Sequence, residues 1–108
     1  MIVGIDLGTT NSLIAVWDNG AARLIPNSLG QMLTPSCVSV DDDDAILVGQ
    51  AARERLQTHP QASAANFKRL MGSDKTLHLG KRAFRPEELS ALVLRSLKED
   101  AEAASATR

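Results

Sequence analysis

The sequence has little of what most metal, disulfide and nucleic-acid sites require. Its one cysteine, Cys37, excludes an internal disulfide, and its two histidines, His59 and His78, stand alone without the spacing of a zinc site. It has no tyrosine, and its three aromatic residues are too scattered for a base-stacking platform. Its net charge of −1 also lacks the basic excess of a dedicated nucleic-acid binder.

Long apolar runs and a basic N-terminal region are absent as well. No apolar run approaches the roughly 20 residues of a membrane span, and the first residues do not resemble a signal peptide. Leucine, isoleucine, valine and phenylalanine nevertheless make up about a quarter of the chain, which is typical of a folded domain with an aliphatic core. We therefore expect one soluble, reduced, cytoplasmic domain that meets neither membrane nor nucleic acid.

Charge is spread unevenly along the chain. Arg23 is the one basic residue among residues 1–50, and the four aspartates at 41–44 make that half acidic. This aspartate run lies between two strand-like segments, which favours a solvated hairpin loop over a cation site. The second half carries a basic cluster that could attract an anion, although a solvated face is the commoner reason for such a run. The cluster comprises Lys68, Arg69, Lys75, Lys81, Arg82 and Arg85, with Asp74 as its one acidic member.

The pattern predicts an α/β or α+β fold with short strands first. We expect strands at residues 2–6, 12–17 and 22–25, with an Asn19-Gly20 turn, and then a loop over 26–35. Hairpins follow at 37–40 with 45–48 and at 75–79 with 82–84, separated by a helix at 50–57. A longer helix begins at Pro86, and residues 103–108 are expected to fray.

The last helix carries an apolar stripe at three- and four-residue spacing. The stripe comprises Leu89, Leu92, Val93, Leu97 and Ala101. Such a stripe packs against something, and the preceding segments offer little continuous sheet for it to cover. We therefore expect the chain to be an incomplete lobe, or alternatively a non-enzymatic interaction module that docks through this stripe.

The segment from Gly4 to Ser12 holds the largest concentration of residues that could form a binding site. A carboxylate, Asp6, ends an apolar strand, and Gly8, Thr9 and Thr10 occupy the turn into the next strand. Successive backbone N–H groups in such a turn form an anion-binding concavity, and a carboxylate fits beside a phosphate when Mg²⁺ lies between them. A plain hairpin turn explains the spacing equally well. Walker A, G-x-G-x-x-G and G-x-S-x-G motifs are all absent from the sequence.

The same segment resembles the first phosphate loop of the DnaK-type heat-shock chaperones, in the actin/sugar-kinase/chaperone ATPase superfamily. Further motifs follow in the order of that family, namely T-P-S at 34–36, V-G-x-x-A at 48–52, K-R-x-x-G at 68–72 and P-E-E-L-S at 86–90. The sequence of residues 13–17 and the short stretch between Gly72 and Pro86 look most like those of the HscC subgroup. A sugar kinase would share the first motif but not the T-P-S or K-R-x-x-G stretches.

The resemblance implies an actin-like, ribonuclease H-like ATPase lobe, with subdomain IA strands over about 1–35 and subdomain IB over about 36–104. It implies ATP or ADP and Mg²⁺ as cofactors, with roles for individual residues. Asp6 would orient Mg²⁺ through water. Gly8 would make room for the phosphates, which Thr9, Thr10 and the Asn11 backbone would hold. Lys68 would approach the γ-phosphate and help to place the attacking water.

The resemblance also implies the activity of a longer protein. Members of the family hydrolyse ATP to drive peptide binding and release in protein folding and the stress response, with J-domain co-chaperones and nucleotide-exchange factors as partners. The second half of the nucleotide site would lie beyond this chain, so we expect the chain alone to be inactive as an ATPase. One departure from the family is Met32-Leu33, where Arg-Thr usually precedes T-P-S.

Overall fold

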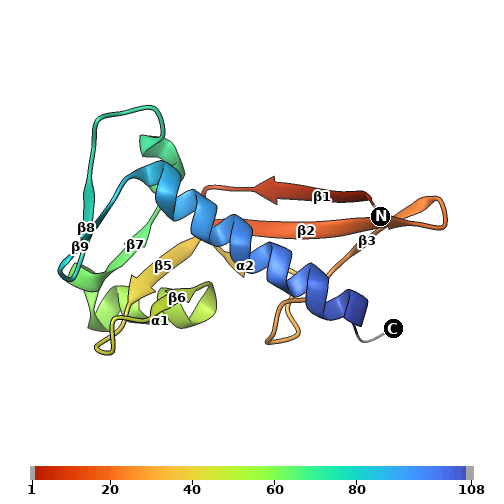
Figure 1. The fold of residues 1–108 in the computed structure, drawn as a ribbon, viewed down its shortest axis with the longest axis horizontal. Helices are drawn as coiled ribbons and strands as arrows, with labels where there is room; N and C mark the ends of the chain where they lie inside the picture. The colour runs from red at the N-terminus through yellow and green to blue at the C-terminus, as the bar shows by residue number, and fades with distance from the viewer. Residues whose placement is uncertain (1, 107–108) are drawn as a thin grey trace.

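The computed structural model describes residues 2–106 (Figure 1). Within this range the strands are β1 (Ile2–Leu7), β2 (Asn11–Asp18), β3 (Ala21–Leu24), β4 (Thr34–Pro35), β5 (Cys37–Val40), β6 (Ile46–Val48), β7 (Ser63–Ala65), β8 (Leu77–Leu79) and β9 (Arg82–Phe84). The α-helices are α1 (Gln50–Thr58) and α2 (Pro86–Ala106), and the 3₁₀ turns are η1 (Pro60–Ala62) and η2 (Phe67–Leu70). This mixed α/β fold with antiparallel sheets confirms the predicted fold class.

The first sheet is built around β2. β1 pairs with one edge of β2 along its length, from Ile2↔Trp17 to Leu7↔Ser12, while β3 and β4 share the other edge. Asn19 and Gly20 both have positive φ, which lets the β2–β3 hairpin turn tightly as predicted. β4 is a correction, because Thr34 and Pro35 lie within the segment predicted to be a loop. Proline is tolerated there because β4 is a two-residue strand at the edge of the sheet.

The second sheet has the order β6-β5-β7 and is covered by α1. β7 and the turns η1 and η2 were not predicted from the sequence. β7 consists of small residues without β-branching, Ser63-Ala64-Ala65, so its extended form depends on pairing with β5 and not on local preference. β8 and β9 form the separate hairpin that the sequence predicted.

Helix α2 runs across both sheets (Figure 1) and packs against β2, β5, β6 and η2. Most of its apolar stripe is in the core, with Leu89, Val93, Leu97 and Ala101 all buried. The other members of this core include Ile14, Val16, Val38, Phe67, Leu79 and Phe84. The expectation that the stripe lacked a sheet to cover is therefore wrong. β2 and the second sheet together cover the stripe. Their strands are separate short segments of the sequence, so no continuous sheet is apparent from it.

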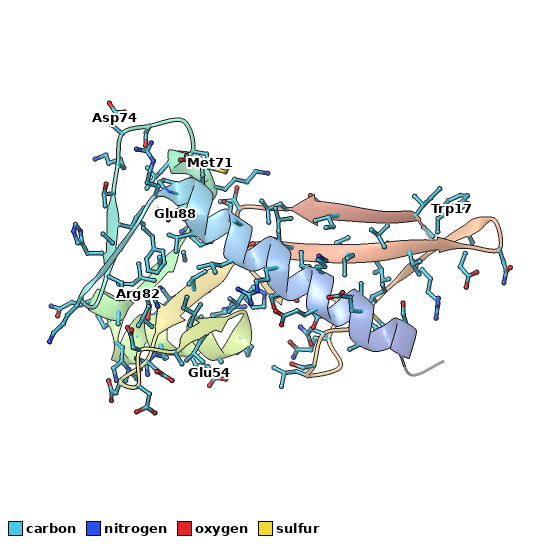
Figure 2. All side chains as sticks on the ribbon, in the orientation of Figure 1. Trp17, Glu54, Met71, Asp74, Arg82 and Glu88 are labelled. Carbon is cyan, nitrogen blue, oxygen red and sulfur yellow. The ribbon has the colours of Figure 1, made fainter. Side chains whose placement is uncertain are left out.

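One further expectation differs from the structure at the end of the chain. Helix α2 continues through Ala103 to Ala106, where fraying was expected, and residues 107–108 lie outside the described range. Trp17 lies on the outside of the sheet near the β2–β3 turn (Figure 2) and is 55% exposed. The two phenylalanines are buried, so the core is aliphatic apart from them.

Candidate functional site

The turn from β1 into β2, residues 8–11, carries the predicted phosphate-binding residues, and its last residue, Asn11, is also the first residue of β2. The pair Leu7↔Ser12 closes the hairpin, so Gly8, Thr9, Thr10 and Asn11 lie together at its end, next to Asp6 on β1. A Cβ atom on Gly8 would overlap the backbone oxygen of Asn11. The loop therefore closes too tightly at this position for any side chain, which is a physical reason for glycine there.

The T-P-S stretch is hydrogen-bonded to this loop through Ser36. The Ser36 hydroxyl donates a hydrogen bond to the Gly8 carbonyl oxygen at 2.8 Å, and the Ser36 N–H donates to the Thr10 carbonyl oxygen at 2.9 Å. The hydroxyl oxygens of Ser12 and Ser36 are also 2.8 Å apart. Both serines are buried, with 1% and 3% of their surface exposed. These bonds hold the Gly8 and Thr10 carbonyl groups of the loop toward Ser36.

Several donors of the loop have no partner in the described part of the chain. Within residues 2–106, the backbone N–H groups of Thr9 and Thr10 donate no hydrogen bond. The side chains of Asp6, Thr9 and Thr10 likewise make no hydrogen bond or ion pair in the described part of the chain, and those of Asp6 and Thr10 are exposed. Successive N–H groups without partners, joined by two hydroxyls, are the donor set of an anion-binding concavity.

The V-G-x-x-A stretch supports the T-P-S stretch from the second sheet. Gly49 has a φ of +90°, and its N–H donates to the Cys37 carbonyl oxygen at 3.0 Å. A Cβ atom on Gly49 would meet the Thr34 methyl group at 3.1 Å. Both the positive φ and this close approach favour glycine at the start of α1. Ala52, the last residue of the motif, lies in α1 and is fully buried.

The K-R-x-x-G stretch forms η2 and places Lys68 on a different element from the loop. Phe67 is 2% exposed and anchors η2 in the core, while Lys68 beside it is exposed. The Lys68 ammonium makes no hydrogen bond or ion pair with any other described residue, the loop included. Structure and sequence thus agree that Lys68 is accessible, but no contact in the described chain joins it to residues 8–11.

Gly72, at the end of the same stretch, connects it to the first turn of α2. Its N–H donates to the Glu87 carboxylate at 3.1 Å, and this bond lowers the pKa of Glu87, with a smaller contribution from Arg85. Arg85 also pairs with Glu87 at 3.3 Å and donates to the Ser73 carbonyl oxygen. The basic cluster is otherwise a solvated face, as the sequence favoured, since Lys68, Arg69, Lys75, Lys81 and Arg85 are all exposed.

The donor set fits Mg²⁺ only in company with a ligand. Among the described residues, no three His, Cys, Asp or Glu side chains gather in a way that could hold a metal ion. Asp6 is thus one carboxylate without a protein cage around it. Mg²⁺ commonly binds through one or two carboxylates together with phosphate oxygens and water, so Asp6 beside an anion-binding loop suits it.

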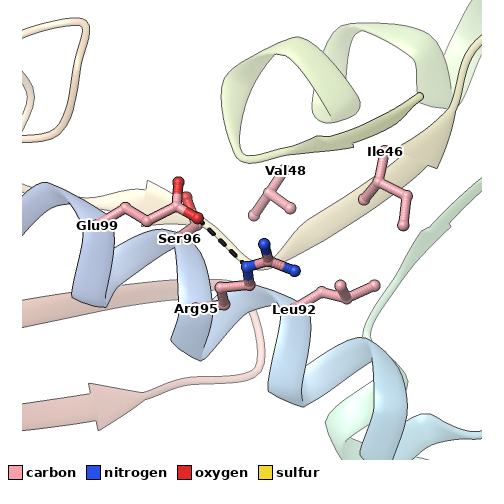
Figure 3. Close-up of a pocket in the computed structure, with 6 residues that line it drawn as sticks. All are labelled: Ile46, Val48, Leu92, Arg95, Ser96 and Glu99. Carbon is pink, nitrogen blue, oxygen red and sulfur yellow. Dashed lines mark ion pairs between the residues drawn. The ribbon is translucent and has the colours of Figure 1, made fainter.

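A recess of about 430 Å³ lies beside Asn11, where the loop meets β2. Met32 and Leu33 line it, so the departure from the family pattern falls next to the loop. Arg53 from α1 also lines it, although the sequence offered no signal that would have singled Arg53 out. The remaining lining residues are Gln31, Pro35 and Gln50. A separate cavity of about 350 Å³ between β6 and α2 contains none of the predicted site residues (Figure 3).

Comparison with known families identifies the chain. The family model for the Hsp70 protein matches residues 2–78, which include the loop, the T-P-S stretch, the V-G-x-x-A stretch and the K-R-x-x-G stretch. The chain belongs to the Hsp70 family. The predicted DnaK-type resemblance is confirmed, whereas the HscC subgroup stays a prediction.

Two relatives show how much of an Hsp70 protein the chain represents. It is 45% identical over 102 residues to the chaperone protein DnaK of Mycoplasmopsis agalactiae, and 47% identical over 102 residues to the chaperone protein DnaK of Mesomycoplasma hyopneumoniae. Each alignment covers 94% of this chain but 17% of the relative. The observed fold is accordingly part of an Hsp70 actin-like ATPase lobe. In the described range, none of the helices is long and apolar enough to cross a membrane.

Proposed function

We propose that this chain is the N-terminal part of the nucleotide-binding domain of an ATP-dependent Hsp70 chaperone, and that residues 8–11 bind the phosphates of Mg-ATP. One observation carries the proposal. The loop keeps its Thr9 and Thr10 N–H groups without partners among the described residues, while its Gly8 and Thr10 carbonyl oxygens are bonded to Ser36. A plain hairpin turn has no need of this separation of donors from acceptors, but an anion site does.

Each predicted residue has a chemical role in this proposal. Gly8 leaves room for the phosphates, and Thr9 and Thr10 donate from their hydroxyl and N–H groups to phosphate oxygens. Asn11 adds its backbone N–H. Asp6 is exposed at the end of β1 and orients the water shell of Mg²⁺, which when bound neutralises phosphate charge.

Lys68 is proposed to reach the γ-phosphate and to help place the attacking water. Its support is the K-R-x-x-G motif, its exposure and its lack of a competing partner among the described residues. A cation held near a transferring phosphoryl group acts by position and charge, without covalent chemistry. Phe67, buried beside it, gives η2 the rigid attachment that such positioning needs.

The division into subdomain IA over about 1–35 and subdomain IB over about 36–104 is supported by the sheets. β1 to β4 form one sheet that ends at Pro35, and the next sheet begins at Cys37. β1 is an edge strand with exposed apolar residues, among them Ile2, Val3 and Ile5, above a groove that Leu94 and Lys98 of α2 also line. We propose that the rest of the lobe covers this surface, since the relatives are several times longer than the chain.

The activity belongs to the complete protein in this proposal. The chain alone has one half of a site, and preorganised surroundings supply much of the catalytic effect, so we expect it to hydrolyse no ATP by itself. In the complete protein, hydrolysis would drive the binding and release of unfolded peptides in the cytoplasm, with a J-domain co-chaperone and a nucleotide-exchange factor. The alternative of a docking module loses its original basis, because the stripe on α2 is buried.

Calorimetric titration of Mg-ATP into the purified chain tests the phosphate loop. We expect binding of millimolar strength or better in the wild type, and weaker binding after Asp6→Ala. Asp42→Ala is the matched control, because Asp42 is also exposed and its removal changes the net charge equally, but it lies in the β5–β6 turn. An absence of heat from a chain that circular dichroism shows to be folded would refute autonomous binding. Equal affinities for all three proteins would refute the role of Asp6.

A further inference from the structure

The hydroxyl of Ser36 lies at the centre of a directed chain of hydrogen bonds. A hydroxyl has one hydrogen, and that of Ser36 is donated to the Gly8 carbonyl oxygen. In the 2.8 Å contact between the Ser12 and Ser36 hydroxyls, Ser12 must therefore be the donor and Ser36 the acceptor. The Ser36 N–H is donated to Thr10. The hydroxyl and the N–H of Ser36 thus donate to Gly8 and Thr10, and its hydroxyl oxygen accepts from Ser12. All three partners lie within residues 8–12.

These bonds also determine where the N–H groups of the loop point. The C=O and N–H of a trans peptide point in opposite directions, and no peptide bond in the described chain is cis. The Gly8 carbonyl shares its peptide group with the Thr9 N–H, and the Thr10 carbonyl shares its peptide group with the Asn11 N–H. Holding both carbonyls against Ser36 therefore directs the Thr9 and Asn11 N–H groups away from Ser36.

We propose that Ser36 is the positioning residue of the phosphate loop, and that it orients the Thr9 and Asn11 N–H groups toward the side where phosphate binds. This inference rests on the proposed function, and it goes beyond it by assigning the serine of T-P-S a role in binding without contact to the ligand. The site is preorganised by this contact, so binding need not reorder the loop. Removing the hydroxyl leaves the part-buried Gly8 carbonyl and the buried Ser12 hydroxyl without that partner.

The first test compares Mg-ATP affinity in three serine variants by calorimetry. We expect Ser36→Ala to weaken binding about tenfold, the effect of an unsatisfied buried polar group on the orientation of the loop. Ser12→Ala is expected to weaken it less, because the bond from Ser36 to Gly8 remains. Ser90→Ala is the matched control: Ser90 is also 3% exposed, but its hydroxyl contacts Met71, away from the loop.

The second test needs no nucleotide and uses ¹H–¹⁵N spectra of the free chain. We expect Ser36→Ala to broaden or double the amide signals of residues 8–11 while the rest of the spectrum is retained, and Ser90→Ala to leave the loop signals unchanged. The proposal would be overturned if the loop signals of Ser36→Ala superimposed on those of the wild type. It would also be overturned if the wild type bound Mg-ATP and Ser36→Ala bound it with the same affinity. If the wild type binds no Mg-ATP, autonomous binding by the loop fails, and the spectra alone decide the role of Ser36.

Discussion

Burial of the α2 stripe makes a sharp prediction for two leucines of the same helix. Leu97 is 1% exposed in the core, whereas Leu94 is 37% exposed at the groove beside β1. Both lie within α2, so replacement by alanine changes helix propensity equally in the two variants. Any difference between Leu97→Ala and Leu94→Ala therefore measures packing alone.

The size of the difference follows from the burial of each side chain. Truncating a buried leucine to alanine costs about 2–5 kcal/mol, because both transfer free energy and packing are lost. We expect Leu97→Ala to lower the free energy of unfolding by about 3 kcal/mol, a large fraction of the stability of a small domain. For Leu94→Ala we expect about 1 kcal/mol or less, because much of its side chain already meets water.

Urea unfolding followed by circular dichroism at 222 nm measures both values. With a urea dependence of about 1–3 kcal/mol per molar, the midpoint of Leu97→Ala should fall by about 1–3 M. The Leu94→Ala midpoint should stay close to that of the wild type. Equal losses in the two variants, or a larger loss for Leu94→Ala, would refute the assignment of the stripe to the core.

Two further predictions concern ionisable groups. The Gly72 N–H lowers the pKa of Glu87, so the ionised carboxylate stabilises the fold above its unfolded-state pKa of about 4.3, and this contribution is lost as the pH falls through the lower folded-state pKa. Glu87→Gln should therefore be less stable than the wild type at pH 7 and equal to it at the lowest pH at which both fold; a difference that persists there, measured by urea unfolding, would contradict this. Burial raises the pKa of the Cys37 thiol, so a disulfide reagent should modify it slowly in the native chain and rapidly in urea. Equal rates in the two conditions would show that Cys37 is not protected.

Local sequence signals predicted those parts of the fold that depend on local physics. The Asn19-Gly20 turn, the aspartate turn at 41–44 and the first turn of α2 at Pro86 all appear where expected. β4 and β7 were missed because each is held by partners distant in the sequence, β2 and β5. The cover over the α2 stripe was missed for the same reason, since it is assembled from separate short strands.

The candidate site divides in the same way. The loop at residues 8–11 is apparent from Gly8, Thr9 and Thr10 in the turn that follows a strand. The contact of Ser36 with Gly8 spans 28 residues, and no periodicity or turn signal predicts it. Arg53 beside Asn11 is also a product of tertiary packing, because its segment reads only as a short helix.

The distant attachment of the loop has a consequence for the order of folding. Leu7 pairs with Ser12 across a short turn, so the β1–β2 hairpin has little chain entropy to overcome. The bonds that shape the turn come from Ser36, and the longer closure makes them slower to form. We therefore expect the first strands to associate early and the geometry of the loop to be acquired only when Thr34 and Pro35 dock on β2. Competence to bind an anion would then mark the completion of folding in this region.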